Sequence, residues 1–383
     1  MSKLKVKYIC SNCGFETLRW LGKCPQCSTW NSFIEEVFET GRAKEKIFKK
    51  ETKFYKLNEI SSNREERIKT GILEFDRVLG GGFIEGSVVL IGGDPGIGKS
   101  TLVLQAVGKI KEKVLYVTGE ESIEQIKMRA NRLKLKSENI LILPETDLNS
   151  ILATIRTETP IVVVIDSIQT VYDSNYDNAA GTVTQIRECT SKLLSEAKKN
   201  NFVVVIIGHV TKEGMLAGPK LLEHIVDTVI QFEGEGKNSY RILRATKNRF
   251  GNTNEIGIFE MQESGLEEVK NPSELFLSGR DKNISGSAVT ASIEGTRPLL
   301  IEVQALVTPS HYGNPQRVAT GYDYRRLSIL LAVLERRANC KVSSHNVFLN
   351  MVGGVRIDEP AADLAICSAI ASSLYDKTCD NNS

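Results

Sequence analysis

The chain has 383 residues, of which 41% are hydrophobic and 25% charged, and a formal net charge of +2. This composition is typical of a globular protein with two or three domains, and it excludes a strongly basic chain that binds nucleic acid through its overall charge. No apolar run is long enough for a membrane span, and the N-terminus has no signal core, so we expect a cytoplasmic protein without membrane contact. Its cysteines should therefore be reduced thiols or metal ligands.

Four cysteines near the N-terminus have the spacing of a zinc module. Cys10 and Cys13 form one C-x-x-C pair, Cys24 and Cys27 form another, and ten residues separate the pairs. Each pair places two thiolates on a tight turn, and two such turns provide the tetrahedral ligand set that Zn²⁺ prefers. A redox dithiol, or four unrelated buried cysteines, are the alternatives.

Three aromatic residues accompany these cysteines. We expect Trp20, Trp30 and Phe33 to pack on the small core of the module, the alternative for the tryptophans being stacking on a nucleic-acid base. Residues 1–38 are therefore predicted to form a four-cysteine zinc finger. The polar, lysine-rich stretch over residues 39–60 is predicted to be a linker.

The most informative motif is a glycine-rich stretch, GDPGIGKST, that fits G-x-x-x-x-G-K-[ST] between an apolar run and a helix-forming stretch. Backbone N–H groups of such a loop, together with the positive end of the following helix, bind a polyphosphate. We expect Lys99 to reach the β- and γ-phosphates and the Ser100 hydroxyl to bind Mg²⁺. The predicted ATP-binding residues are Gly93, Asp94, Pro95, Gly96, Ile97, Gly98, Lys99, Ser100 and Thr101.

Apolar strand patterns alternate with helical patterns on both sides of this loop. Strands are predicted over residues 88–91, 114–118, 161–165 and 203–207, and helices over 101–111, 122–133, 148–157 and 183–200. Continuous apolar strands between amphipathic helices predict a parallel sheet that is covered on both faces. Residues 61–272 are therefore predicted to form an α/β ATPase domain that binds its ligand at the carboxyl ends of the strands.

Four polar residues follow these strands and, with Lys99, complete the candidate active site. Asp166 is expected to help hold Mg²⁺. A carboxylate at the position of Glu120 or Glu121 can orient the attacking water, although acidic residues also suit the first turn of a helix. His209 is either structural or a sensor of the γ-phosphate.

Three further segments are candidates for DNA contact. They are the polar stretch over residues 173–181, the loop over residues 211–220, which contains Lys212 and Lys220, and a pentapeptide after a strand-like run. Two cations beside an aromatic ring suit phosphate contact and base stacking. They equally suit contact with the nucleotide of a neighbouring subunit. A solvated hairpin turn is the remaining alternative. The pentapeptide consists of Lys247, Asn248, Arg249, Phe250 and Gly251.

Taken in order, these motifs resemble the RadA (Sms) family of bacterial DNA-repair proteins over essentially the whole chain. The resemblance is carried by the cysteine finger, LGGGFIEGSVVLIGGDPGIGKST, YVTGEES, VVVIDSIQT, IIGHVTKEG and, most distinctively, KNRFG. It implies a RecA-like ATPase that forms homo-hexamers, binds single-stranded and branched DNA, and drives branch migration of recombination intermediates together with the RecA recombinase. It also implies that Glu120 activates water and that KNRFG serves the DNA-dependent function.

Residues 273–383 resemble the proteolytic domain of Lon proteases, as this family implies. Strands are predicted on both sides of a turn within 285–307, and helices over 323–337 and 361–374. Where Lon has its nucleophilic serine this chain has Ala361, and a methyl group cannot attack a carbonyl, so we expect no serine proteolysis there. A complete Lon-like domain would continue further, so we expect a truncated domain that serves ring assembly and DNA contact.

The sequence therefore predicts a DNA-dependent ATPase of recombinational repair that uses ATP, Mg²⁺ and Zn²⁺. The alternative is a RecA-like regulatory ATPase of the circadian-clock type, which acts on protein partners. Stimulation of ATP hydrolysis by DNA separates these two hypotheses.

Overall fold

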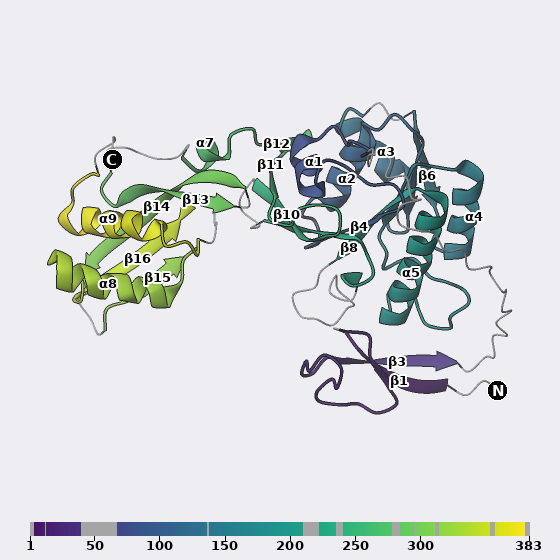
Figure 1. The fold of residues 1–383 in the computed structure, drawn as a ribbon, viewed down its shortest axis with the longest axis horizontal. Helices are drawn as coiled ribbons and strands as arrows, with labels where there is room; N and C mark the ends of the chain where they lie inside the picture. The colour runs from purple at the N-terminus through teal and green to yellow at the C-terminus, as the bar shows by residue number, and fades with distance from the viewer. Residues whose placement is uncertain are drawn as a thin grey trace, which may run out of the picture. The chain divides into compact units, whose positions relative to one another are not determined.

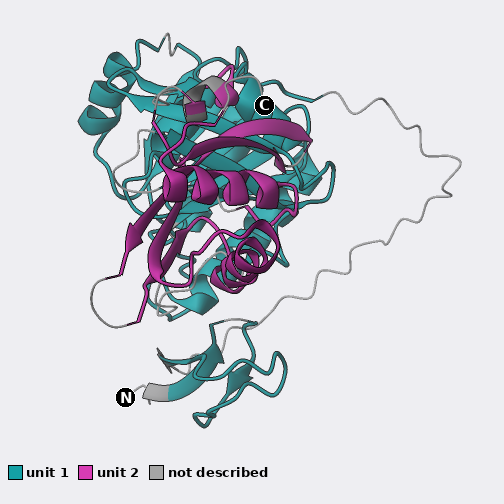
Figure 2. Cartoon of the chain, turned by 90° about the vertical axis from the view of Figure 1, so that its left-hand side faces the viewer, with its two compact units in different colours: residues 1–234, 239–268 teal, residues 235–238, 269–383 magenta. Residues whose placement is uncertain are grey.

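The computed structural model describes residues 4–11, 13–39, 67–135, 138–209, 222–234, 240–277, 284–294, 296–310, 314–352 and 357–379. The chain divides into two compact units (Figure 2). The larger unit comprises residues 1–234 and 239–268, and the smaller unit comprises residues 235–238 and 269–383.

The described part of the larger unit is built on a nine-stranded sheet in the order β12-β11-β10-β9-β4-β8-β7-β5-β6 (Figure 1). Strands β9, β4, β8, β7, β5 and β6 pair in parallel, and β10, β11 and β12 extend the sheet with antiparallel pairs. The parallel strands are β4 (Val88–Gly93), β5 (Val114–Thr118), β6 (Ile140–Pro144), β7 (Val162–Asp166), β8 (Val203–His209) and β9 (Thr228–Glu233). The antiparallel strands are β10 (Tyr240–Asn248), β11 (Ile256–Gln262) and β12 (Gly265–Glu268).

Successive residues of the central strands enter two different hydrophobic cores. In β4, Val89 and Ile91 belong to one core, while Val88 and Leu90 belong to the other, because side chains alternate between the faces of a strand. The first core is closed by α1 (Leu73–Leu79), α2 (Lys99–Val107) and α3 (Ile123–Arg132), and the second by α4 (Leu148–Glu158) and α5 (Val183–Asn200). The predicted α/β sheet with both faces covered is confirmed.

The differences from the predicted elements lie mainly at the edges of this sheet. Strand β6 is half-exposed and ends in Pro144, and β10 carries exposed as well as buried residues. Such strands lack the continuous apolar run that identifies a central parallel strand. Helix α2 begins at Lys99 and ends at Val107, before Gly108, which is its C-cap, so it is shorter than the predicted helix over residues 101–111.

The N-terminal part of the larger unit forms a small antiparallel sheet of its own. Its strands are β1 (Leu4–Cys10), β2 (Glu16–Thr17) and β3 (Phe33–Glu39), in the order β2-β1-β3. Cys10 is the last residue of β1, and the loops that follow carry Cys13, Cys24 and Cys27, the other cysteines of the predicted zinc finger.

The smaller unit contains a four-stranded sheet in the order β13-β14-β16-β15. Its strands are β13 (Ser287–Glu294), β14 (Arg297–Pro309), β15 (Arg317–Thr320) and β16 (His345–Met351), and its helices are α7 (Pro272–Leu277), α8 (Tyr324–Ala338) and α9 (Ala362–Tyr375). The predicted hairpin within residues 285–307 and both predicted helices are confirmed. Ala361 is the N-cap of α9. Among the helices in the described ranges, none has the length and apolar character needed to cross a bilayer.

Candidate nucleotide site and metal centre

The glycine-rich loop connects the end of β4 to the first turn of α2. Gly96 and Gly98 have φ angles of 76° and 114°, which residues with a side chain rarely adopt. A Cβ atom on Gly98 would lie 2.7 Å from Met261 Cε. The loop therefore requires glycine for its backbone conformation and for its close contact with β11.

Lys99 is almost fully buried at the start of α2, and its ammonium group points back into the loop. Its Nζ donates hydrogen bonds to the carbonyl oxygens of Gly93 (2.7 Å) and Asp94 (2.9 Å). Burial lowers the pKa of Lys99, and the negative charges of Asp166, Asp94 and Glu120 oppose this shift. The amine thus lies where the loop would hold phosphates, and it is surrounded by acidic groups.

The two predicted magnesium ligands lie together at the carboxyl end of the sheet. The Ser100 hydroxyl forms a hydrogen bond with Asp166, which ends β7. Burial raises the pKa of Asp166, while hydrogen bonds from Tyr116 and Ser100 lower it. A buried carboxylate beside a serine hydroxyl is a donor set that fits Mg²⁺.

Tyr116 is a site residue that the sequence analysis missed. Its hydroxyl donates a 2.5 Å hydrogen bond to Asp166 Oδ2, and burial together with the nearby carboxylate raises the pKa of the phenol. A tyrosine inside a fully buried strand needs a polar partner for its hydroxyl, and this requirement was the signal available in the sequence.

The neighbouring glutamates after β5 face different partners. Glu120 accepts a hydrogen bond from the buried Ser167 hydroxyl, and its charge acts on Lys99. Glu121 forms an ion pair with Arg129 of α3. Both charges act on Asp166, and Glu120 is distinguished by its further effect on Lys99 of the glycine-rich loop.

His209 also ends a strand beside this loop. It is the last residue of β8, and its backbone pairs in register with Gly93 of β4. Lys212 and Lys220 lie outside the described residues.

The pentapeptide begins with the last two residues of β10 and is tied to neighbouring backbone by specific contacts. Lys247 donates hydrogen bonds to the carbonyl oxygens of Glu223 and Val226, the second at 2.8 Å. Burial lowers the pKa of Lys247. Because these contacts fix the lysine within its own chain, the pentapeptide is more than a solvated turn.

The other members of the pentapeptide make similar contacts. Arg249 lies 3.2 Å from the buried carboxylate of Asp227, whose second oxygen accepts from the Val88 N–H at 3.1 Å. Asn248 donates to the Leu79 carbonyl at 3.2 Å, and the Phe250 carbonyl accepts from Arg67 at 2.6 Å. The Arg249 side chain still has 46% of its surface exposed. It is therefore the more exposed of the two cations of the pentapeptide.

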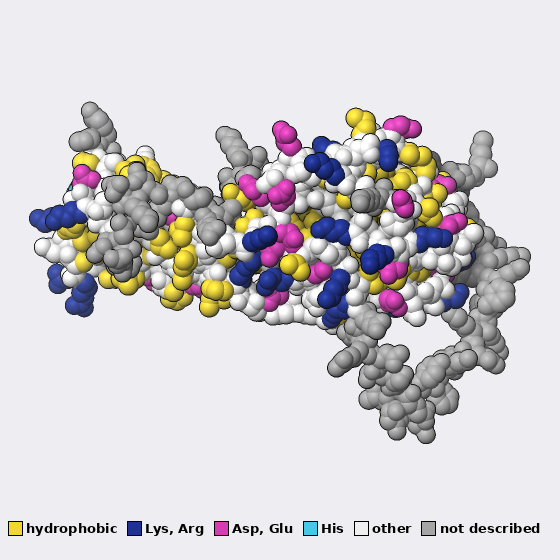
Figure 3. Space-filling model, turned by 90° about the horizontal axis from the view of Figure 1, so that it is seen from above, with side chains coloured by type: hydrophobic (Ala, Val, Ile, Leu, Met, Phe, Trp, Pro, Cys, Tyr) yellow, Lys and Arg dark blue, Asp and Glu magenta, His cyan; other side chains and the backbone are white. Residues whose placement is uncertain are grey.

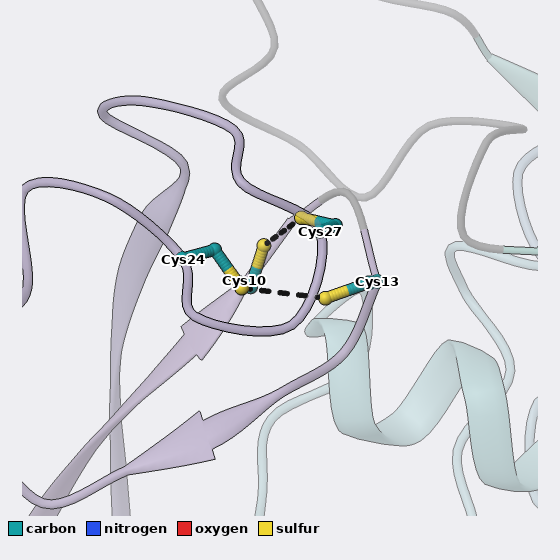
Figure 4. A group of neighbouring side chains, drawn as sticks. All are labelled: Cys10, Cys13, Cys24 and Cys27. Atoms are coloured by element: carbon teal, nitrogen blue, oxygen red, sulfur yellow. Dashed lines mark hydrogen bonds between the residues drawn. The ribbon is translucent and has the colours of Figure 1, made fainter.

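The four N-terminal cysteines converge on one point (Figure 4). Their sulfur atoms all lie within 4.8 Å of one another, with 3.6 Å between Cys10 and Cys27 and 3.5 Å between Cys13 and Cys24. Tetrahedral Zn²⁺ with Zn–S bonds of about 2.3 Å requires sulfur separations of about 3.8 Å. The cluster thus has the size of a zinc site.

Both cysteine pairs use the same turn. Gly14 N donates to Cys10 O at 2.8 Å and Ser28 N donates to Cys24 O at 2.9 Å, and both donors have positive φ angles. Burial raises the pKa of the Cys13 thiol, and the three neighbouring cysteines raise it further. A bound cation would lower the raised thiol pKa and allow four thiolates to lie together.

The tryptophans do not pack as expected. Phe33 is buried in the small core with Cys10 and Cys24, but Trp20 is 54% exposed and Trp30 is 69% exposed. The prediction that both tryptophans cap the core is wrong, because a module of this size offers too little interior for two indole rings.

The family models and the relatives that match this chain agree with this arrangement. An ATPase family model described as KaiC matches residues 68–142, and a zinc-ribbon model described as a rubredoxin metal binding domain matches residues 8–35. The DNA repair protein RadA of Bacillus subtilis is 51% identical over 384 residues, which cover 98% of this chain and 84% of that protein. RadA of Listeria monocytogenes is 51% identical over 382 residues, which cover 98% of this chain and 83% of that protein. The crystal structure of a KaiC-like protein from Pyrococcus horikoshii aligns with 53% of this chain and 99% of its own, with 24% identity and a TM-score of 0.45.

Proposed function

This chain belongs to the RadA family of DNA repair proteins, and we propose that it is a DNA-dependent ATPase that drives branch migration of recombination intermediates. The observation that carries the proposal is the grouping of Lys99, Ser100, Asp166 and Glu120 around one glycine-rich loop. These groups supply the phosphate contact, the metal ligands and the base that hydrolysis of ATP needs.

Residues 93–101 would bind the triphosphate of ATP through backbone N–H groups and the Lys99 ammonium. Ser100 and Asp166 would hold Mg²⁺, which supplies positive charge against the phosphate oxygens. The hydroxyl of Tyr116 keeps Asp166 in position and favours its ionised form. The cysteine cluster would hold one Zn²⁺, whose binding free energy stabilises the ribbon.

Glu120 is the general base in this proposal. Its carboxylate takes a proton from the attacking water as the water oxygen bonds to the γ-phosphorus. The bond between the γ-phosphorus and the bridging oxygen breaks, and ADP leaves with its electron pair. Ser167 orients the carboxylate through its hydroxyl. Glu121 is assigned to positioning α3, because it is already paired with Arg129.

DNA contact is assigned to particular basic side chains and not to the electrostatic field of the whole chain. On the face of the larger unit seen in Figure 3, Lys and Arg side chains are interspersed with Asp and Glu. We assign the contact to Arg249 and Lys247, with Lys212 and Lys220 as further candidates. In a homo-hexameric ring the same Arg249 would also be available to a neighbouring subunit's nucleotide.

The same proposal includes the RecA recombinase as a partner, a cytoplasmic location, and a smaller unit that serves assembly and not proteolysis. Ala361 precedes α9 at the position where the Lon resemblance expects a serine. The regulatory clock-type alternative is not favoured, because the curated relatives that match nearly the whole chain are DNA repair proteins.

Branch migration is tested with a deproteinised three-strand DNA intermediate, incubated with this chain and ATP, with and without RecA. We expect ATP-dependent conversion to the migrated product, faster with RecA, and none with Lys99→Ala. Wild-type protein that hydrolyses ATP but leaves the intermediate unchanged under both conditions would contradict the proposed function.

A further inference from the structure

Two large aromatic side chains on the zinc ribbon have no role in either site. Trp20 and Trp30 have 54% and 69% of their surface exposed. Indole is among the largest apolar groups in proteins and gains more from burial than most, so two exposed indoles on one small module need an explanation. A structural role in the ribbon core does not supply it, because that core is made by Cys10, Cys24 and Phe33.

The two rings lie beside the same glycine. A Cβ atom placed on Gly22 would be 3.8 Å from ring atoms of both Trp20 and Trp30. The backbone there is held by an antiparallel bridge between Lys23 and Trp30 and by a 2.8 Å hydrogen bond from Asn31 N to Gly22 O. The second cysteine turn is part of the same segment, so metal binding would fix the spacing of the two rings.

A basic residue accompanies each ring, in space for Trp30 and in the chain for Trp20. The Lys23 ammonium lies 5.6 Å from the centroid of the Trp30 ring, and Arg19 is exposed next to Trp20 in the chain. No acidic residue occurs between Glu16 and Glu35, and Glu16 forms an ion pair with Lys7 at 3.2 Å. Aromatic faces with adjacent cations are the combination that binds bases and phosphates of single strands.

We propose that Trp20 and Trp30 form a stacking platform for bases of single-stranded DNA, with Arg19 and Lys23 supplying charge for its phosphates. This platform rests on the proposed function and adds a DNA contact that is separate from the pentapeptide. A single strand fits better than a duplex, because its base faces are open to stacking. A protein partner fits less well, because a stable protein interface buries about 800 Å² on each side around an apolar centre, whereas these rings stand among cations.

The chain offers a direct probe of this surface, because Trp20 and Trp30 are its only two tryptophans. Selectively excited tryptophan fluorescence of the full chain therefore reports on the platform alone. Titration with an oligothymidylate should quench this fluorescence as bases stack, and the quenching should follow the same binding curve as the anisotropy of a labelled oligothymidylate. Trp20→Ala and Trp30→Ala should each weaken binding about tenfold.

Two controls separate stacking from a general effect. Trp20→Phe and Trp30→Phe keep an aromatic face and should retain most of the affinity. Tyr324→Ala removes a ring that is 55% exposed in the smaller unit and should leave affinity unchanged. All variants should keep their zinc content and their ATP turnover without DNA, because both tryptophans lie outside the ribbon core and the nucleotide site.

The outcomes distinguish the platform from the proposed function. Binding seen by anisotropy without tryptophan quenching, and with unchanged affinity in both alanine variants, would overturn the platform and leave the surface to a protein partner. Absence of any DNA binding at low salt would overturn the platform and the DNA-dependent function together.

Discussion

The nucleotide site and the cysteine cluster of the larger unit gain their rigidity in different ways. The glycine-rich loop is attached to β4, whose residues are buried on both faces between two hydrophobic cores. The cysteine turns are attached to a ribbon whose own small core is Cys10, Cys24 and Phe33, while Ile9 of β1 is buried in the second core of the larger unit. We therefore expect the first site to form before its ligand binds and the second to depend on a bound metal for stability.

The largest effect is expected from Lys99→Ala, which removes the buried ammonium from the loop. ATP turnover should fall by about 1,000-fold, because a buried positive charge that stabilises the transition state is lost. Phosphate release measures the loss, and zinc content should remain unchanged. Lys111→Ala, which changes an exposed lysine just after the same helix, should keep full activity; an equal loss in that variant would contradict the assignment.

The next effect separates the two adjacent glutamates. Glu120→Gln should lower the turnover number about 100-fold while ATP still binds, because the amide cannot accept a proton from water. Glu121→Gln should have a much smaller effect, since its main contact is the ion pair with Arg129. Steady-state turnover with a fluorescent nucleotide-binding assay measures both, and the reverse order would assign the base to Glu121.

Metal removal should affect the ribbon alone. Cys10→Ser, or treatment with a strong chelator, should remove the zinc and unfold the ribbon, whose own core is too small to sustain it. ATP turnover without DNA should persist, because the nucleotide site rests on its own sheet. Metal analysis and limited proteolysis check this result, and collapse of the whole larger unit would show that the two sites are not independent.

The smallest effect concerns stability around the pentapeptide. Arg249→Gln should lower the free energy of unfolding by about 1 kcal/mol, because buried Asp227 loses one partner and keeps its bond to Val88 N–H. DNA stimulation of turnover should be lost at the same time. Urea denaturation and DNA-stimulated ATPase assays measure the two effects, and Arg249→Lys should retain more stability than Arg249→Gln.

The sequence identified the sheet and its loop because both depend on local patterns. A short unbroken apolar run between helical patterns is typical of a strand buried on both faces, and the spacing from Gly93 to Ser100 specifies the phosphate loop. The strands of the antiparallel edge gave weaker signals, since β10 mixes exposed and buried positions. Their pairing depends on contacts that are distant in sequence.

Residues whose roles depend on tertiary contacts could not be identified from local sequence patterns. Glu120 and Glu121 are neighbours with the same chemistry, and only the positions of Ser167 and Arg129 distinguish them. Tryptophan is a large apolar residue that is usually buried, so the sequence alone places Trp20 and Trp30 in a core. Their exposure follows from the small volume of the ribbon. In both cases the deciding quantity is a three-dimensional arrangement.

The most direct test of the DNA-dependent ATPase is ATP hydrolysis with and without single-stranded DNA, measured over a range of salt concentrations. We expect DNA to stimulate turnover and the stimulation to fall steeply as salt rises, because phosphate contacts release counterions. Turnover that is the same with and without DNA at every salt concentration, in a sample that sizing shows to be assembled, would contradict the account.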